Sequence, residues 1–512
     1  MIVEPFNLAQ HCVGRSAAAF PDKTALIIVS DADRPESAER WAYGALDRAV
    51  RSVAAGLLAE GMQPGDRILL RLPDSSDYVL LFFGAIAAGM VPVPVSAHLT
   101  AAEVQLLVVD SEAVAIAQIA KLAIPVLPAG CRELDGLAME RLKSTAPLAA
   151  FAATRADEAA YSIYTSGTTS RPKGVVHAHQ VALGRMPMYR DWMGLTGADT
   201  MLHAGAFNWS YTLGVGLIDP WASGATAVLY NGPRQVEVWP KVIAAVGATL
   251  FAAVPSLFRQ MLKYCHLTPE SLPTLRHALA AGEPLSPALL AAWQEATARP
   301  IFEAFGMSEI STFVSNRPGM PVRPGSPGKP QTGRRVAVLP LDGGTHPVPV
   351  GQIGLLAVHR SDTGLMSGYW HRPEEEQQVF RGDWFIGGDL ASFDAEGYMW
   401  HHGRADDMMN AGGFRVSPLE VETALAPCPG IAEIAVAEHR VREDVSVIAA
   451  YVVKNEGASV LQADILAFAD SRLAAYKRPK LIYFVSFLPR STNGKLLRRK
   501  LSDEAMILQT LP

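Results

Sequence analysis

The sequence predicts an α/β protein: a large N-terminal domain of parallel-rich sheets covered by helices, and a small α+β C-terminal domain. Over most of the chain, short β-rich runs alternate with helical runs, which is typical of parallel sheets covered by helices. Beyond residue 406 the order changes to helix, two strands, helix and strand. The 512 residues are 49% apolar and 19% charged, which is enough for the packed cores of two or more domains.

The alternation begins with a strand at 67–72, a helix from residue 77 and an extended run at 91–95. The apolar stretch 78–97 is about as long as a membrane span, but its glycines and prolines favour a buried helix that runs into a strand. Further strands are expected at 225–230, 249–253 and 277–280, and further helices at 236–246, 256–264 and from residue 286. The C-terminal domain should contain helices at 418–425 and 461–474 and strands at 431–437, 445–453 and 481–485.

Charge and cysteine content limit the class of protein. The formal charge of −5 argues against a nucleic-acid-binding protein, which usually carries a basic surplus. The four cysteines are far apart and form no C-x-x-C pair, so we expect free thiols in a reducing compartment. The N-terminus lacks the basic start and apolar run of a signal peptide. We therefore expect a soluble, cytoplasmic protein without a membrane span.

The most informative segment is YTSGTTSRPKG at 164–174, where five Ser and Thr residues, two glycines and two cations occur together. Small residues let backbone N–H groups approach an anion, the hydroxyls donate hydrogen bonds, and Arg171 and Lys173 supply charge. A polar turn that binds nothing is the alternative, which the Pro-Lys-Gly ending and the β-like runs on both sides disfavour. The chain lacks the nucleotide P-loop, the dinucleotide fingerprint and the nucleophile elbow, so kinase, Rossmann and hydrolase assignments lose their main support.

This loop resembles the signature of the acyl-adenylate-forming (AMP-binding) superfamily, which includes acyl-CoA synthetases. Further motifs occur in the order of that family: AGEP at 281–284, EAFGMSE at 303–309, GD at 388–389, GRADD at 403–407 and NGK at 493–495. The segments 313–317 and 416–422 resemble the benzoate-CoA ligase branch. The resemblance implies an ATP-dependent acyl-CoA ligase. A carboxylate would attack ATP to give an acyl-adenylate and diphosphate, and coenzyme A would then displace AMP.

The resemblance also implies the nucleotide site. Lys495, Glu309 and Thr165 would be catalytic, and Glu309 would bind Mg²⁺. Phe305, where the family mostly has Tyr, would stack on adenine, and Asp389 would accept from the ribose hydroxyls. The ATP-binding residues would be Thr165, Ser166, Gly167, Thr168, Thr169, Lys173, Gly282, Glu283, Pro284, Glu303, Ala304, Phe305, Gly306, Met307, Ser308, Asp389 and Arg404.

A hinge at Asp406 is implied between an AMP-binding and acyl-binding domain at 1–405 and a lid domain at 406–512. One orientation of the lid would present Lys495 for adenylation. The other would present Ala411, Gly412 and Gly413 to the pantetheine arm of coenzyme A. The nucleotide part of coenzyme A would contact Tyr476, Lys477 and Arg478, although a basic helix end is an equally good interpretation of these three residues.

The acyl pocket is expected from Phe207, Asn208, Trp209, Gly306, Ser311 and Thr312. Gly306 would leave room where acetate-specific relatives carry Trp, and these segments show no Lys or Arg to pair a second carboxylate. We therefore expect a modest monocarboxylate: benzoate-like, alicyclic or short branched. Aromatic residues of an ordinary α/β core are the alternative for Phe207 and Trp209.

Two other functions are also compatible with the sequence. A stand-alone adenylation enzyme would share the first half-reaction but load a carrier-protein thiol. A non-catalytic nucleotide or acyl-AMP sensor would not need the full set of charged residues. The expected partners are the small carboxylate, ATP and coenzyme A, with no nucleic acid; a homodimer stays open. His177 and His179 could face one side of a strand, but the sequence offers no third metal ligand for them.

Overall fold

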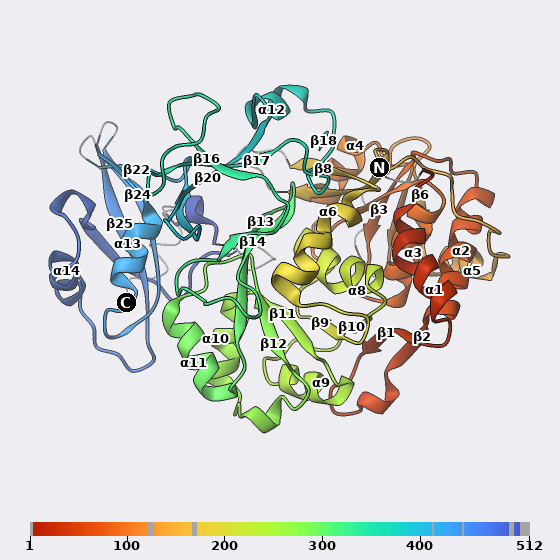
Figure 1. Cartoon of the computed structure of the whole chain (residues 1–512), viewed down its shortest axis with the longest axis horizontal. Coiled ribbons are helices and arrows are strands. Elements are labelled where there is room, and N and C mark those ends of the chain that lie inside the picture. Colours follow the sequence, from red (N-terminus) through yellow and green to blue (C-terminus); the bar gives the residue numbers. More distant parts are fainter. Residues whose placement is uncertain are drawn as a thin grey trace. The chain divides into compact units, whose positions relative to one another are not determined.

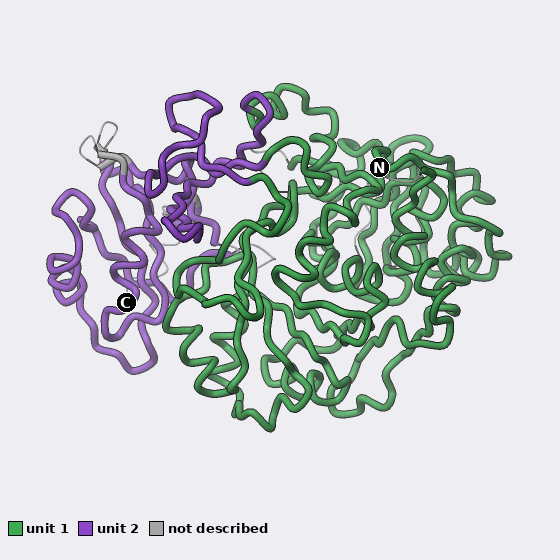
Figure 2. The backbone as a smooth tube through the Cα atoms, viewed as in Figure 1, with its two compact units in different colours: residues 1–335, 359–380 green, residues 336–358, 381–512 purple. Residues whose placement is uncertain are grey.

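The computed structural model describes residues 4–119, 122, 126–165, 172–411, 414–442, 445–490 and 496–501. The chain divides into two units: unit 1 comprises residues 1–335 and 359–380, and unit 2 comprises residues 336–358 and 381–512 (Figure 2). The predicted boundary at Asp406 would instead assign 336–358 and 381–405 to the N-terminal domain, and it stays a prediction. In the described part of the chain, no helix combines the length and apolar character needed to cross a bilayer.

The largest sheet of unit 1 has nine strands in the order β15-β14-β13-β12-β11-β9-β10-β1-β2 (Figure 1). Its central six strands, from β13 to β1, run parallel to their neighbours, while β2 and β14 are antiparallel additions. The bounds are β1 Thr24–Val29, β2 Glu39–Ala42, β9 Thr200–His203, β10 Thr226–Tyr230, β11 Leu250–Ala253, β12 His277–Ala280, β13 Ile301–Met307, β14 Ser311–Ser315 and β15 Lys329–Pro330. The parallel-rich sheet predicted from the alternating pattern is confirmed.

Helices cover both faces of this sheet, because its buried strands are apolar on both sides. Leu202 and Phe251 face a core that includes residues of α9, α10 and α11. Their neighbours Met201 and Leu250 face a second core that contains Trp192. The helices of unit 1 are α1 Arg15–Ala19, α2 Tyr43–Ala59, α3 Ser76–Ala87, α4 Ala101–Asp110, α5 Gly136–Ser144, α6 Val181–Met188, α7 Ser210–Leu213, α8 Asp219–Ala222, α9 Val238–Val246, α10 Pro255–Tyr264, α11 Pro287–Thr297 and α12 Pro373–Gln378.

Two smaller sheets complete unit 1. One is parallel, in the order β4-β3-β5-β6, and the other is antiparallel, in the order β18-β8-β7. The apolar stretch 78–97 forms the buried part of α3 and then β4, as predicted, and Ser75 caps α3 by accepting from the Tyr78 amide. The bounds are β3 Arg67–Arg71, β4 Val91–Pro94, β5 Ala115–Gln118, β6 Arg132–Leu134, β7 Ala159–Thr165, β8 Lys173–Ala178 and β18 Gly368–Tyr369.

Unit 2 contains a sheet in the order β16-β17-β20-β19, with β21 paired to β20, a β22-β23 hairpin and a β24-β25-β26 sheet. The sheet β24-β25-β26 and its two helices enclose a core of their own that includes Val421, Val436 and Ile465. The predicted C-terminal elements are all present, but β24 is longer and α14 shorter than predicted. The bounds are β16 Val336–Leu339, β17 Gly354–His359, β19 Phe380–Arg381, β20 Trp384–Phe393, β21 Met399–Arg404, β22 Met409–Ala411, β23 Phe414–Val416, α13 Pro418–Leu425, β24 Ile431–Arg442, β25 Val445–Lys454, α14 Gln462–Asp470 and β26 Leu481–Phe484.

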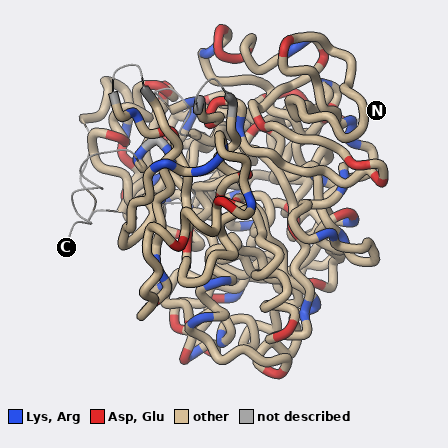
Figure 3. The backbone as a smooth tube through the Cα atoms, turned by 90° about the vertical axis from the view of Figure 1, so that its left-hand side faces the viewer, with Lys and Arg blue, Asp and Glu red and all other residues tan. Residues whose placement is uncertain are grey.

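The cysteines follow the expectation from the sequence, and charged side chains of the two signs are mixed. Lys and Arg are interspersed with Asp and Glu along the chain (Figure 3). Cys12, Cys131, Cys265 and Cys428 are all free thiols.

Candidate nucleotide and acyl site

The predicted phosphate loop lies in the segment that connects the two strands of a β-hairpin. Strands β7 and β8 are antiparallel, and Thr165 and Lys173 form their last cross-strand pair. Ser166, Gly167, Thr168 and Thr169 lie outside the described residues. The Nζ atom of Lys173 lies 2.6 Å from Oε2 of Glu375 on α12, so a carboxylate of the same unit already balances this predicted phosphate ligand.

The predicted metal ligand Glu309 lies in the turn between the antiparallel strands β13 and β14. The Tyr369 hydroxyl donates to Oε1 of Glu309 at 2.8 Å, and the Met366 amide donates to the backbone carbonyl oxygen of Glu309 at 2.6 Å. The Tyr369 ring also lies 5.3 Å from the Lys173 Nζ atom. Tyr369 therefore brings the hairpin end and the Glu309 turn together, a role that the sequence did not indicate.

His177 supports the same turn from β8. Its Nε2 atom lies 2.9 Å from the carbonyl oxygen of Ser308, and its ring stacks on Tyr161 at 4.9 Å. Burial lowers the pKa of His177 to about 4, so at neutral pH the uncharged imidazole donates from Nε2. His179 instead accepts from the Leu8 amide at 3.0 Å. Within the described ranges, no three His, Cys, Asp or Glu side chains are grouped as metal ligands would be.

Gly282 joins the predicted adenine wall to the predicted acyl pocket. Its φ is +90°, and a Cβ atom there would lie 2.6 Å from Cη2 of Trp209, so the Trp209 indole lies directly against this glycine. The neighbouring Glu283 accepts from the backbone and hydroxyl of Ser256 at 3.1 and 3.3 Å. Its negative charge therefore lies at the N-terminal turn of α10, where it is stabilised by the helix dipole.

Glu303 is a buried carboxyl group on β13. Its Oε1 atom accepts from the Leu285 amide at 3.0 Å, which ties β13 to the turn that contains Gly282 and Pro284. Burial raises the pKa of Glu303 to about 8, although the Leu285 hydrogen bond opposes the shift. The next residue, Ala304, is buried in the core, while Phe305 packs edge-to-face on Phe313 at 5.8 Å.

Gly306 and Ser311 occupy a constrained part of the β13–β14 hairpin. A Cβ atom at Gly306 would lie 2.2 Å from the Ser311 carbonyl oxygen, so a side chain there requires the β14 backbone to move. Ser311 itself has a φ of +70°, and its hydroxyl contacts the guanidinium of Arg185. Arg185 also pairs with Asp219 through two contacts of 2.6 and 2.7 Å, and both side chains are buried. The sequence did not indicate Arg185, because it lies on α6, outside the motifs.

The other predicted acyl-pocket residues differ in burial: one is packed in the core and two are only half-buried. Phe207 is 3% exposed and stacks on Tyr78 at 5.7 Å, so much of its ring belongs to the core. Asn208 and Trp209 are half-buried, and Trp209 packs edge-to-face on Tyr211 at 5.2 Å. Buried polar atoms without a hydrogen-bond partner also occur in this region: Oγ1 of Thr312, Oγ1 of Thr212 and Nε2 of His203.

In unit 2, the predicted ribose and hinge residues lie together at the end of one hairpin. Asp389 on β20 and Arg404 on β21 are cross-strand partners, with 3.4 Å between Oδ2 and Nη1. His401 contacts the other oxygen of Asp389 at 2.9 Å, and Arg404 also donates to Asp406 at 2.8 Å. Gly388, with a φ of +86°, lets the Arg404 side chain approach the backbone.

The predicted coenzyme A residues also belong to unit 2. Ala411 ends β22, whereas Gly412, Gly413 and the catalytic candidate Lys495 lie outside the described residues. Lys477 pairs with Glu420 and Arg478 pairs with Asp470, so both cations have carboxylate partners. Tyr476 is 40% exposed. The swivel that would bring Lys495 to the phosphate loop stays a prediction.

Comparisons with known proteins match most of the chain. The family described as AMP-binding enzyme matches residues 13–370, and the AMP-binding enzyme C-terminal domain matches residues 420–495. A benzoate–CoA ligase of Thauera aromatica is 32% identical over 98% of this chain and 96% of its own. A benzoate CoA ligase from Burkholderia xenovorans LB400 superposes with a TM-score of 0.87 at 29% identity, covering 97% of this chain and 100% of its own. ATP-bound MatB from Rhodopseudomonas palustris superposes with a TM-score of 0.88 at 25% identity, covering 99% and 100%.

Proposed function

The chain belongs to the AMP-binding enzyme family, and on that premise we propose that it ligates a compact monocarboxylic acid to coenzyme A. The general reaction is that of an AMP-forming acid–CoA ligase: a carboxylate and ATP give an acyl-adenylate, which coenzyme A converts to the thioester. The proposal concerns the acid and the residues that perform each step.

The first half-reaction joins two anions, so the site must neutralise charge where the carboxylate meets the α-phosphate. We assign this task to Lys495 and to Lys173, which would exchange Glu375 for phosphate oxygen. Glu309 fits Mg²⁺, because it is a half-buried carboxylate that Tyr369 holds by one oxygen, and Mg²⁺ commonly takes one or two carboxylates together with phosphates. The ion would supply charge neutralisation on the phosphates.

The aromatic character and the charge of the predicted pocket support a single carboxylate. Trp209 lies against Gly282, and Tyr211 packs on Trp209, so the described wall is aromatic. Arg185 contacts the hydroxyl of Ser311, another predicted acyl residue, but Asp219 already pairs its guanidinium through two contacts. The paired charge of Arg185 is the observation that carries the proposal, because a second carboxylate would need a cation that is not already matched.

A ligation screen tests the proposal. Purified protein with ATP, Mg²⁺ and coenzyme A would be offered benzoate, cyclohexanecarboxylate, isobutyrate, acetate, malonate and succinate, with release of diphosphate and formation of the thioester both measured. We expect the highest kcat/KM with the first three acids. A preference for malonate or succinate would overturn the proposal and would make Arg185 the first residue to re-examine.

The same assay addresses the remaining assignments. Diphosphate release without any thioester would favour the enzyme that loads a carrier-protein thiol. No carboxylate-dependent diphosphate release with any acid would favour a sensor. A cytoplasmic location and a homodimer stay predictions from the sequence.

A further inference from the structure

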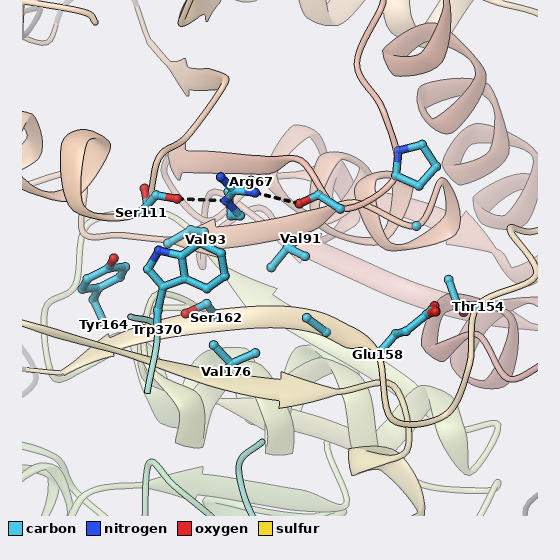
Figure 4. A pocket seen from close by; sticks show the side chains of 14 residues that line it. Arg67, Val91, Val93, Ser111, Thr154, Glu158, Ser162, Tyr164, Val176 and Trp370 are labelled. Atoms are coloured by element: carbon cyan, nitrogen blue, oxygen red, sulfur yellow. Dashed lines mark hydrogen bonds between the residues drawn. The ribbon is translucent and has the colours of Figure 1, made fainter. Parts of the chain in front are cut away.

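A cavity of about 310 Å³ lies in unit 1, between the sheet that contains β4 and the sheet that contains β7 and β8 (Figure 4). Figure 4 shows Val91 and Val93 on one side and Val176 on the other, with Trp370 and Tyr164 at one end. Tyr164, the first residue of the 164–174 segment, lines it, but among the described residues none of those predicted to bind the nucleotide, the acid or coenzyme A does. Its lining consists of Pro64, Gly65, Arg67, Gly89, Val91, Val93, Ser111, Thr154, Glu158, Ala159, Ser162, Tyr164, Val176 and Trp370.

The cavity contains an unsatisfied hydroxyl group. Ser162 on β7 is 4% exposed, and its Oγ atom has no hydrogen-bond partner. A buried hydroxyl normally has a partner, because leaving it unpaired costs free energy. In contrast, the Thr154 hydroxyl donates to the Phe6 carbonyl at 2.8 Å, and the Tyr164 hydroxyl donates to Asp110 at 2.7 Å. The unpaired Ser162 hydroxyl is therefore the polar group that a ligand would satisfy.

Arg67, the cation of the cavity lining, is already paired. Arg67 donates to the carbonyl oxygens of Ser111 and Gly65 at 2.9 and 3.0 Å, and it pairs with Glu112 at 3.1 Å. Its guanidinium carbon lies 4.8 Å from the Trp370 ring centroid. Glu158, at the opposite end in Figure 4, is exposed and accepts from the Arg155 amide at 3.0 Å. Because Arg67 is already paired and Glu158 adds a negative charge to the lining, the cavity disfavours an anion.

We propose that this cavity is a second ligand site, which binds a small uncharged ring compound carrying one hydroxyl or carbonyl oxygen. An apolar cavity of about 150 Å³ is enough for benzene, so this space holds one ring with short substituents. The valines and the Trp370 indole contact the ring, and the Ser162 hydroxyl bonds its oxygen. The inference does not depend on which acid the enzyme ligates.

Fluorine NMR of the full chain tests the site with 4-fluorophenol, which is uncharged at pH 7. We expect saturable binding to the wild type. Ser162→Ala should weaken the Kd for 4-fluorophenol about threefold to tenfold and leave that for fluorobenzene unchanged, because fluorobenzene lacks the oxygen. Ser315→Ala is the matched control, since it removes a buried hydroxyl that lies outside the cavity and already donates to Asp191. It should leave both Kd values unchanged.

Val91→Phe fills the cavity from β4 and should abolish the binding, with circular dichroism to verify that the variant folds. Failure of 4-fluorophenol to bind the wild type would overturn the proposal. Binding that is as tight in folded Val91→Phe as in the wild type would also overturn it, because the phenol would then occupy another pocket. If Val91→Phe does not fold, the Ser162→Ala comparison alone decides: equal Kd values for 4-fluorophenol in Ser162→Ala and the wild type would reject the site. Any binding of 4-fluorobenzoate should be the same in Val91→Phe as in the wild type. Loss of 4-fluorobenzoate binding in Val91→Phe would mean that the cavity binds an anion, which would contradict the proposal of an uncharged ligand.

Discussion

The two parts of the predicted nucleotide site are built in different ways. In unit 1, the Glu309 turn depends on partners that lie far away in the chain. Tyr369 follows it by 60 residues, and His177 precedes Ser308 by 131. In unit 2, Asp389 has its partners His401 and Arg404 on the next strand, 12 and 15 residues away. The first part is a product of tertiary packing, and the second is a single hairpin.

This difference predicts how each part responds to substitution. A local hairpin positions its residues by cross-strand register, so an aspartate there keeps its place when one neighbour is lost. The Glu309 turn also belongs to a hairpin, between β13 and β14, but its side-chain and carbonyl groups are held by Tyr369, Met366 and His177 from other segments, so each of these contacts matters separately. The expected effects are largest where a residue touches the reacting atoms and smallest where it acts only on folding.

The largest effect is expected for Lys495→Ala in unit 2. A positioned cation that stabilises the reacting centre contributes on the order of 100- to 1,000-fold to a rate. Carboxylate-dependent ATP–diphosphate exchange should fall by that order, while conversion of supplied acyl-adenylate to thioester continues. Equal loss of both half-reactions would contradict the assigned role.

Asp406→Pro should slow the thioester step roughly 10- to 100-fold and affect adenylation much less, because a restricted hinge misplaces the residues of the second step. Asp406→Ala is the matched control, since it removes the carboxylate that contacts Arg404 but leaves the backbone free. Single-turnover measurements of each half-reaction separate the two steps. If alanine and proline have the same effect, the ion pair matters and the hinge does not.

Tyr369→Phe tests the long-range support of Glu309. Loss of the hydroxyl that donates to Oε1 should raise the Mg²⁺ concentration for half-maximal exchange roughly 10-fold, as for other groups that hold a metal ligand. Tyr230→Phe is a suitable control, because it removes a hydroxyl that donates to the Pro233 carbonyl instead. An unchanged Mg²⁺ dependence would show that the turn holds Glu309 without help.

Glu375→Gln tests whether the ion pair of Lys173 competes with phosphate. The pair is only partly exposed, so removing its negative charge should lower the KM for ATP about threefold. Steady-state kinetics at a fixed, saturating acid concentration measures this. A higher KM would instead mean that Glu375 positions Lys173 for the nucleotide.

Glu303→Gln should change stability more than activity. The folded-state pKa of about 8 lies above the ordinary value of 4.5, so the unfolded chain releases its proton first and the wild type loses stability as pH rises from 4.5 to 8. Glutamine keeps an oxygen for the Leu285 amide and cannot ionise. The free energy of unfolding of the variant relative to the wild type should therefore increase by about 1–3 kcal/mol between pH 5 and pH 8. Urea unfolding at both pH values measures it, and a constant difference would contradict the raised pKa.

Local signals were enough for much of the fold. Ser417 accepts from the Glu420 amide and Pro418 opens α13, so the start of this helix has a clear local signal, and the helix spans 418–425 as predicted. Strand β24 continues beyond the predicted residue 437 to Arg442, because its partner β25 pairs with it along that length. The end of a strand depends on its neighbour, and a single sequence does not contain that information.

The sequence by itself determined the family, and it predicted the phosphate loop and the charged residues of each motif, because family motifs are fixed by residue type and short spacing. Tertiary structure alone decided that Tyr369 holds Glu309, that His177 holds Ser308 and that Arg185 is balanced by Asp219 next to Ser311. It also decided that Ser162 would be buried without a partner in a cavity between two sheets. Each of these contacts joins segments brought together by packing of apolar faces, and the burial that shifts a pKa or leaves a hydroxyl unpaired exists only after that packing.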